Sequence, residues 1–160
     1  MVPSSNIEPI DEVNRAILSS LGIQASVKNT IPSGTFTYYT HQKYQARAFT
    51  LELGKVYTFG NNDLSKFEAT KRGLIDLLTN KQSSIRSPVM EFYVSQELIK
   101  ENEAYKFYID SKEQNFTVLE ANQKIDSKHT ANGSERILFP NPNVQLGQRT
   151  GLLISSIESS

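Results

Sequence analysis

Glu52 is the side chain whose place in the sequence best suits chemistry. It lies near the end of residues 46–53, whose alternating pattern predicts a strand, and Gly54 follows that run. Ligand sites in α/β sheets form beyond the carboxyl ends of strands, where a carboxylate held away from bulk water can act as a general acid or base. An ordinary ion pair with Lys55 at a strand end is the alternative, and the residue pattern alone favours that alternative.

The other residue types that perform catalysis form no recognisable motif. His41 and His129 lie far apart in the sequence, neither has a His or Cys neighbour at ligand spacing, and the chain contains no cysteine. We expect both histidines to be surface or helix-flank residues. No Gly-x-Ser-x-Gly motif marks a nucleophilic serine. Tyr38, Tyr39 and Tyr44 form an aromatic group that could line a pocket or pack in a core.

The elements that must position these residues divide into two unlike parts. In the first part, Pro9 opens a predicted helix that Gly22 caps, and a short strand is expected near residues 23–27. Residues 35–44 are aromatic and ambiguous. Asn61, Asn62 and Asp63 are the N-cap candidates for a second helix, whose apolar residues share one stripe: Leu64, Phe67, Leu74, Ile75 and Leu78. Alternating strand, turn and helix indicate a piece of an α/β sheet.

The second part reads as β structure. Residues 80–88 are polar and form the natural linker, and after them come short β-prone runs at 89–99, 105–109, 116–119, 137–139 and 151–157. Asn132-Gly133 is a strong turn signal. We therefore predict two domains, residues 1–82 with the α/β part and residues 83–160 as a small all-β sandwich or barrel.

Composition excludes several classes of partner. The 17 basic and 17 acidic side chains cancel, so the chain lacks the basic surface that nucleic acid or an anionic membrane requires. No stretch approaches the roughly 20 apolar residues that span a bilayer. The first residues contain neither a basic segment nor an apolar one, so no signal peptide is expected. A soluble protein of the cytoplasm is the default expectation.

Several segments in a fixed order change this interpretation. These segments are residues 32–37 (Pro-Ser-Gly-Thr-Phe-Thr), 50–55 (Thr-Leu-Glu-Leu-Gly-Lys), 59–60 (Phe-Gly), 62–64 (Asn-Asp-Leu) and 137–144 (Ile-Leu-Phe-Pro-Asn-Pro-Asn-Val), then Gly147, Arg149 and Gly151. In this order and with compatible spacing, over nearly the whole chain, they closely resemble the succinylglutamate desuccinylase/aspartoacylase family.

The resemblance implies a fold and a reaction. The family's catalytic domain is similar to zinc carboxypeptidases, a mixed sheet flanked by helices, and a small β domain follows it. The implied reaction is hydrolysis of N2-succinylglutamate to succinate and glutamate, the last step of the succinyltransferase route of arginine breakdown. In such enzymes zinc polarises the amide carbonyl and a glutamate moves the proton. The resemblance makes Glu52 that general acid/base.

The sequence also departs from the family pattern. The family's zinc ligands, a His-x-x-Glu pair and a later histidine, come from the N-terminal half of the catalytic domain, which precedes the first residue here. We therefore expect a C-terminal half that is inactive by itself, with zinc in the full-length parent and the missing half as its partner. Relatives place an arginine before the Glu52 segment, where this chain has Gln42 and Lys43, and alternation points Arg47 away from Glu52.

Lys55 and Lys43 are therefore the candidates for binding the dicarboxylate substrate, because anionic groups favour cationic partners. Solvated surface lysines are the alternative for both. Two alternatives for the function also stand. The chain could be a non-catalytic binding module derived from the family, or it could act on another acyl amino acid, as aspartoacylase does.

Overall fold

The computed structural model describes residues 8–29, 34–54, 57–110 and 112–157, which form two compact units. The helical unit comprises residues 10–26, 34–54 and 57–90, and the β unit comprises residues 8–9, 27–29, 91–110 and 112–157. None of the helices in these ranges has the length and hydrophobicity needed to cross a bilayer.

The helical unit begins with α1 (Glu12–Ser20). Asp11 is its N-cap and accepts a hydrogen bond from the backbone N–H of Asn14 at 2.8 Å, and Gly22 follows the helix at φ +73°. Leu18 and Leu21 are buried. The predicted helix and its glycine cap are therefore confirmed, but the helix begins at Glu12 and not at Pro9. The strand β1 (Ala25–Lys28) follows close to the predicted strand.

Residues 35–53 differ from expectation. The ambiguous aromatic run forms α2 (Phe36–Tyr44), capped by Thr35, whose hydroxyl accepts from the backbone N–H of Tyr38 at 3.3 Å. The helix ends at Gln45, which adopts the left-handed conformation at φ 52°. The strand predicted at residues 46–53 is wrong, because none of these residues pairs with a neighbouring strand. A β-prone run becomes a strand only when a neighbour completes its hydrogen bonds.

The second predicted helix forms in two pieces, η2 (Leu64–Phe67), a 3₁₀ turn, and α3 (Glu68–Leu78). Of the three N-cap candidates, Asp63 is the N-cap, and its carboxylate accepts from the backbone N–H and the hydroxyl of Ser65 at 3.1 and 2.6 Å. These hydrogen bonds hold the pKa of Asp63 below its usual value. Residues 81–88 then carry no regular structure, in agreement with the predicted linker.

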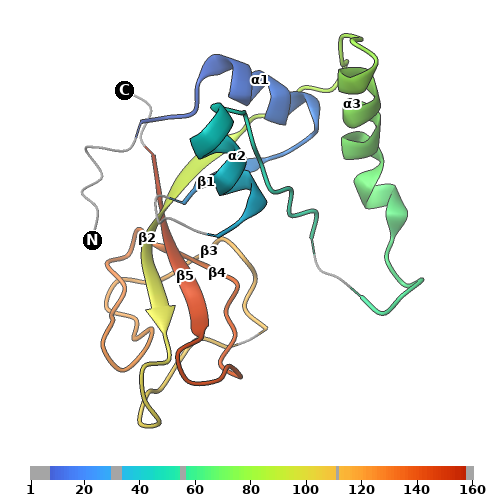
Figure 1. Ribbon diagram of the computed structural model, residues 1–160. Helices are drawn as coiled ribbons and strands as arrows, with labels where there is room; N and C mark the ends of the chain where they lie inside the picture. The colour runs from blue at the N-terminus through green and yellow to red at the C-terminus, as the bar shows by residue number, and fades with distance from the viewer. Residues whose placement is uncertain (1–7, 30–33, 55–56, 111, 158–160) are drawn as a thin grey trace. The chain divides into compact units, whose positions relative to one another are not determined.

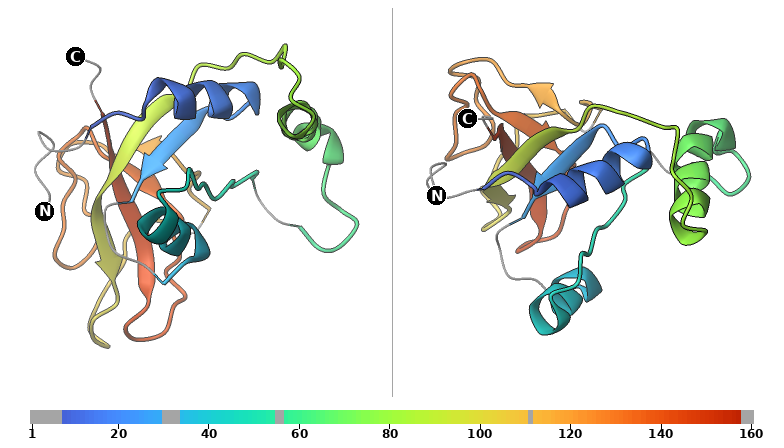
Figure 2. Two further views of the ribbon diagram at one scale, coloured as in Figure 1. Left: turned by 45° about the horizontal axis from the view of Figure 1, so that its top comes forward. Right: turned by 90° about the horizontal axis from the view of Figure 1, so that it is seen from above.

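The sheet has the order β1-β2-β5-β4-β3 (Figure 1). Its longest pair, β2 (Met90–Ile99) and β5 (Arg149–Ser156), is antiparallel and runs side by side in every view (Figure 2). Short strands β4 (Arg136–Leu138) and β3 (Thr117–Val118) extend it, also antiparallel. The run predicted at 105–109 contributes a single bridge, Phe107 to Asp126.

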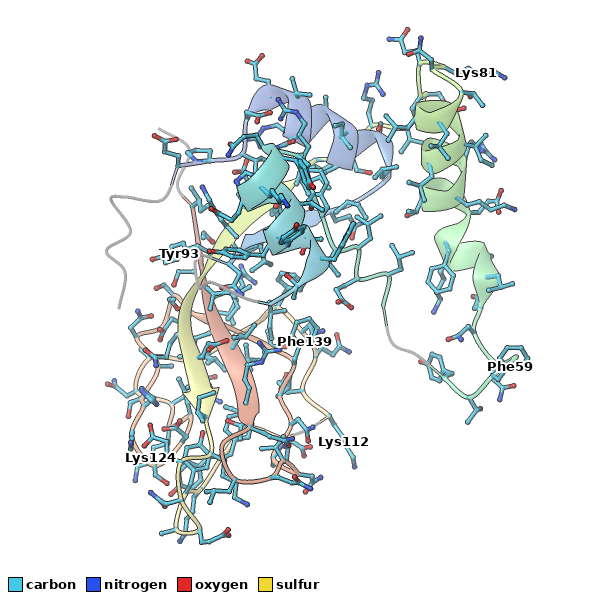
Figure 3. All side chains as sticks on the ribbon, viewed as in Figure 1. Phe59, Lys81, Tyr93, Lys112, Lys124 and Phe139 are labelled. Atoms are coloured by element: carbon cyan, nitrogen blue, oxygen red, sulfur yellow. The ribbon has the colours of Figure 1, made fainter. Side chains whose placement is uncertain are left out.

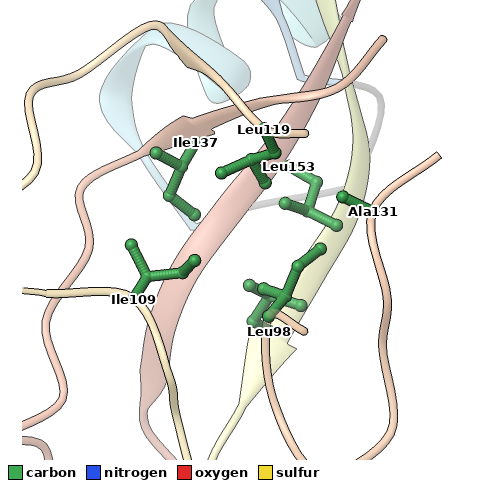
Figure 4. Packing of buried hydrophobic residues seen from close by; sticks show 7 residues of the cluster. Leu98, Ile109, Leu119, Ala131, Ile137 and Leu153 are labelled. Atoms are coloured by element: carbon green, nitrogen blue, oxygen red, sulfur yellow. The ribbon is translucent and has the colours of Figure 1, made fainter. Parts of the chain in front are cut away.

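A cluster of buried hydrophobic side chains forms a core in the β unit (Figure 4). Leu98, Ile125 and Ile137 have no solvent exposure, and loop residues pack around them. The same cluster contains Ile109, Leu119, Ala131 and Leu153. Burial of this many aliphatic side chains is the main stabilising term for such a small unit.

Candidate functional site

Glu52, the predicted general acid/base, lies in the irregular segment that follows α2. Its side chain is exposed, and among the described residues it makes no hydrogen bond or ion pair. Gly54 follows at φ +112°, a conformation that only glycine adopts readily. Lys55, its suggested partner, lies outside the described residues. The carboxylate is thus accessible from solvent and not shielded as the sequence pattern suggested.

The start of the Glu52 segment is fixed to α2 and α1. The ring Nδ1 of His41 lies 3.1 Å from the carbonyl oxygen of Ala46. The Arg47 guanidinium forms an ion pair with Asp11 at 2.6 Å and donates to the side chain of Asn14 at 2.8 Å. The backbone N–H of Asn14 and the Arg47 guanidinium together hold the pKa of Asp11 below its usual value.

Arg47 therefore has a structural partner at the N-terminus of α1. The alternation argument rested on a strand that does not form, so it gives no support for the direction in which Arg47 points. His41 is exposed on α2, in agreement with the expected helix-flank histidine.

Lys43 lies within an exposed aromatic group on α2. Its ammonium donates to the hydroxyl of Tyr39 at 2.9 Å and lies 5.4 and 5.5 Å from the ring centroids of Tyr39 and Tyr44. The two rings meet edge to face, with centroids 6.2 Å apart. A lysine held over aromatic rings loses less entropy when it binds an anion than a freely rotating one.

The described residues do not fit a zinc site. No three His, Cys, Asp or Glu side chains gather within them at a spacing that could hold a metal ion. His41 and His129 belong to different units, and Glu52 has no histidine partner within the described ranges.

A buried polar network in the β unit was not predicted from the sequence. The side chain of Asp126 is fully buried and accepts from the backbone N–H groups of Lys128 and His129, both at 2.7 Å. The Nδ1 of His129 lies 2.9 Å from both of its oxygens, and the Tyr105 hydroxyl donates to it at 2.8 Å. Tyr105 also bonds to the buried hydroxyl of Thr150 at 2.9 Å.

The electrostatics of this network follow from its hydrogen bonds. Burial acts to raise the pKa of Asp126, but the hydrogen bonds from His129, Lys128 and Tyr105 outweigh burial and hold that pKa below its usual value. Burial raises the pKa of Tyr105 to about 12, against the effect of Thr150 and with the help of Asp126. His129 is thus a half-buried partner of Asp126, and the expectation of a surface histidine is wrong for it. The Asp-x-x-His spacing was the available signal.

Two family models match this chain. The model described as the succinylglutamate desuccinylase/aspartoacylase catalytic domain matches residues 4–78, and the AstE/AspA barrel-sandwich hybrid domain matches residues 87–157. The chain belongs to the succinylglutamate desuccinylase/aspartoacylase family. The predicted fold class of this family member, an α/β part with helices followed by a small β domain, is confirmed.

Curated relatives in this family carry the name succinylglutamate desuccinylase. The protein of Chromobacterium violaceum is 38% identical over 148 residues, and that of Serratia proteamaculans is 35% identical over 146 residues. Each match covers 87% of this chain but only 44% and 45% of the relative. The chain therefore spans less than half the length of the curated relatives it matches.

Solved structures of the same family have the same fold. The succinylglutamate desuccinylase of Vibrio cholerae superimposes with a TM-score of 0.82 at 27% identity, over 90% of this chain and 44% of that one. The Chromobacterium violaceum enzyme gives 0.73 at 37% identity, over 90% of this chain and 45% of that one.

Proposed function

We propose that these 160 residues form part of an amide hydrolase that cleaves N2-succinylglutamate to succinate and glutamate, in the cytoplasmic breakdown of arginine. The observation that carries the proposal is the match to succinylglutamate desuccinylases over 87% of the chain. The catalytic-domain model matches residues 4–78, which include the Glu52 segment. Residues 1–82 contribute to the catalytic domain and residues 83–160 form the small β domain.

Glu52 acts as the general acid/base. Hydrolysis joins a water oxygen to the succinyl carbonyl carbon and breaks the carbon–nitrogen bond, and the nitrogen leaves as the amine of glutamate. Glu52 accepts a proton from the water and delivers it to that nitrogen. The accessible carboxylate, which has no partner among the described residues, is available for this role.

Lys43 and Lys55 bind carboxylates of the substrate. The aromatic setting of Lys43 supports its part of the proposal, because Tyr39 and Tyr44 hold the ammonium in place. Zinc is the cofactor of the complete enzyme in this proposal, with ligands from the part of the catalytic domain that has no counterpart in these residues. The 160-residue polypeptide alone is therefore expected to be inactive.

The test uses a single-chain chimera. The part of the Chromobacterium violaceum relative that has no counterpart here is placed ahead of these 160 residues, and glutamate release from N2-succinylglutamate is measured with zinc supplied. We expect turnover by the chimera and a loss of about 10²–10⁴-fold in kcat for Glu52→Gln, the range for removal of a general acid/base. The exposed Glu120→Gln is the matched control and should retain full activity.

Two results would contradict the proposal. Turnover by the 160-residue polypeptide alone, abolished in Glu52→Gln, would show that it is not inactive. A chimera that cleaves N-acetylaspartate in preference to N2-succinylglutamate would favour an aspartoacylase-like substrate, since one family model describes both activities.

A further inference from the structure

Helix α3 packs against α1 through only one of its faces. The hydroxyl of Thr70 donates to the carbonyl oxygen of Leu21 at 2.9 Å. Three residues later, Gly73 approaches so closely that a Cβ there would lie 2.3 Å from the carbonyl oxygen of Ser20. Thr70 and Gly73 are the only buried residues of α3. This small-residue face allows the two backbones to approach closely, and it makes the contact between α3 and the end of α1.

A second face of α3 is apolar and exposed. It carries Leu74, Ile75 and Leu78, which neighbour one another at spacings of three and four residues. Their exposed fractions are 38%, 50% and 85%, and Leu64 in η2 is 72% exposed. We call Leu64, Leu74, Ile75 and Leu78 the α3 stripe. Its residues belong to the apolar stripe that the sequence predicts, and in the described part of the chain all four remain exposed.

Exposure of this kind is concentrated in the helical unit. All but four of the exposed large apolar side chains lie there, and one of them, Phe59, is fully exposed at the bend before η2 (Figure 3). In the β unit, in contrast, a cluster of buried aliphatic residues forms a core. Folded monomers seldom leave contiguous apolar surface uncovered, so such surface indicates a binding partner.

The family matches indicate which partner fits. The catalytic-domain model matches up to residue 78, the last residue of α3. The relatives carry more than half of their length outside the match. The exposed apolar surface thus lies in the one unit that corresponds to part of a larger domain, while the β unit matches the hybrid domain.

We propose that the α3 stripe is the docking surface for the remainder of the catalytic domain, the polypeptide that relatives possess and these 160 residues do not match. The occupant presents aliphatic or aromatic side chains from one helix or strand, whether it lies on the same polypeptide or on a second one. This inference rests on the proposed function, because it takes its occupant from that domain.

The absence of cysteine from the sequence allows a direct test. Leu78→Cys places one thiol on the stripe, and Val118→Cys, at an exposed position in the β unit, is the matched control. Each variant is treated with a maleimide, alone and in the chimera with the Chromobacterium violaceum segment, and modification of the introduced cysteine is followed by peptide mass. We expect at least about tenfold slower labelling at residue 78 in the chimera, one order of magnitude in accessibility, and unchanged labelling at residue 118.

Equal labelling of Leu78→Cys in both forms would overturn the inference. The same labelling is repeated with the Chromobacterium violaceum segment co-expressed as a separate polypeptide, so that a chimera that fails to fold does not decide the result. Absence of protection at residue 78 in both experiments would contradict the proposal. Slow labelling in the 160-residue polypeptide alone, together with a dimeric mass, would assign the stripe to a second copy. Protection of residue 78 without glutamate release would support the docking surface and contradict the proposed function. Glutamate release without protection would support the proposed function and contradict the docking surface.

Discussion

At the scale of single residues, the setting of Lys43 differs from that of an ordinary surface lysine. Tyr39 accepts its hydrogen bond, and both tyrosine rings lie beside its ammonium. If it binds a substrate carboxylate equally in the ground and transition states, its loss raises KM and leaves kcat nearly unchanged.

We therefore expect Lys43→Ala in the chimera to raise KM for N2-succinylglutamate about tenfold, the equivalent of one charge-assisted hydrogen bond of about 1.5 kcal/mol. Steady-state kinetics measures this effect. Lys66→Ala, which removes an exposed lysine from η2, is the control and should leave KM unchanged. An unchanged KM for Lys43→Ala would show that Lys43 is a solvated surface lysine that does not bind the substrate.

Asp126 gives a prediction that depends on pH. Its folded-state pKa is depressed, so the folded chain binds this proton less readily than the unfolded chain does. The stabilisation is then present in full above the unfolded pKa of about 3.9 and is lost as pH falls through the folded pKa. Asp126→Asn should lower the free energy of unfolding by about 2 kcal/mol at pH 7, since it disrupts a buried network.

Urea unfolding of the wild type and Asp126→Asn between pH 2 and 7 measures this difference. We expect the two stabilities to converge at the acid end. Asp110→Asn, at an exposed aspartate whose amide replacement keeps an acceptor for Lys112, should follow the wild type throughout. A difference between Asp126→Asn and the wild type that is the same at every pH would contradict this account.

At the scale of elements, the approach of α3 to α1 depends on the missing side chain of Gly73. Alanine is the better helix former by about 1 kcal/mol, so Gly73→Ala would stabilise an isolated helix. In this chain the added Cβ would meet backbone atoms of Ser20 and Leu21, which cannot move as a flexible side chain could. The packing penalty of about 1–3 kcal/mol should outweigh the helical gain.

We expect Gly73→Ala to lower the free energy of unfolding by up to about 2 kcal/mol in chemical denaturation followed by circular dichroism. Arg72→Ala, at the neighbouring exposed position, is the control and should change it by less than about 0.5 kcal/mol. A stabilised Gly73→Ala variant would mean that α3 can withdraw from α1 at no cost.

The elements also show which parts of the fold are predictable from sequence. Gly22 and Asp63 are local signals, Gly22 for the end of one helix and Asp63 for the start of another, and both are confirmed. Residues 46–53 carry an equally regular pattern, but strand formation depends on a neighbour, which local sequence cannot supply. The network of Asp126 escaped prediction for a similar reason, since Tyr105 and Thr150 approach it only through the tertiary fold. The catalytic assignment of Glu52 came from family resemblance and remains a prediction.

At the scale of the whole molecule, the two units differ in how many of their apolar side chains are buried. The β unit has a continuous aliphatic core, while α2 buries none of its residues. Local opening is easiest where few apolar contacts must break. The two units should therefore open independently in the 160-residue polypeptide.

Native-state hydrogen exchange tests this expectation. Amides of the buried β5 residues Leu152, Leu153 and Ile154 should exchange at least about 100-fold more slowly than amides in the middle of α2. Equal protection of both sets would show that the 160 residues unfold as one cooperative body. In the chimera, protection of the helical unit should rise while that of β5 stays constant.

The ion pair between Arg47 and Asp11 has a mechanical consequence for the catalytic proposal. It links positions 36 residues apart and attaches the start of the Glu52 segment to the N-terminus of α1; this ion pair is called the anchor. Glu52 stands five residues beyond the anchor, so with Arg47 bound its backbone can travel no further than about 17 Å from it, at about 3.4 Å per residue. The anchor is exposed to solvent, and added salt weakens it. Added salt should therefore increase the distance over which the Glu52 carboxylate can move.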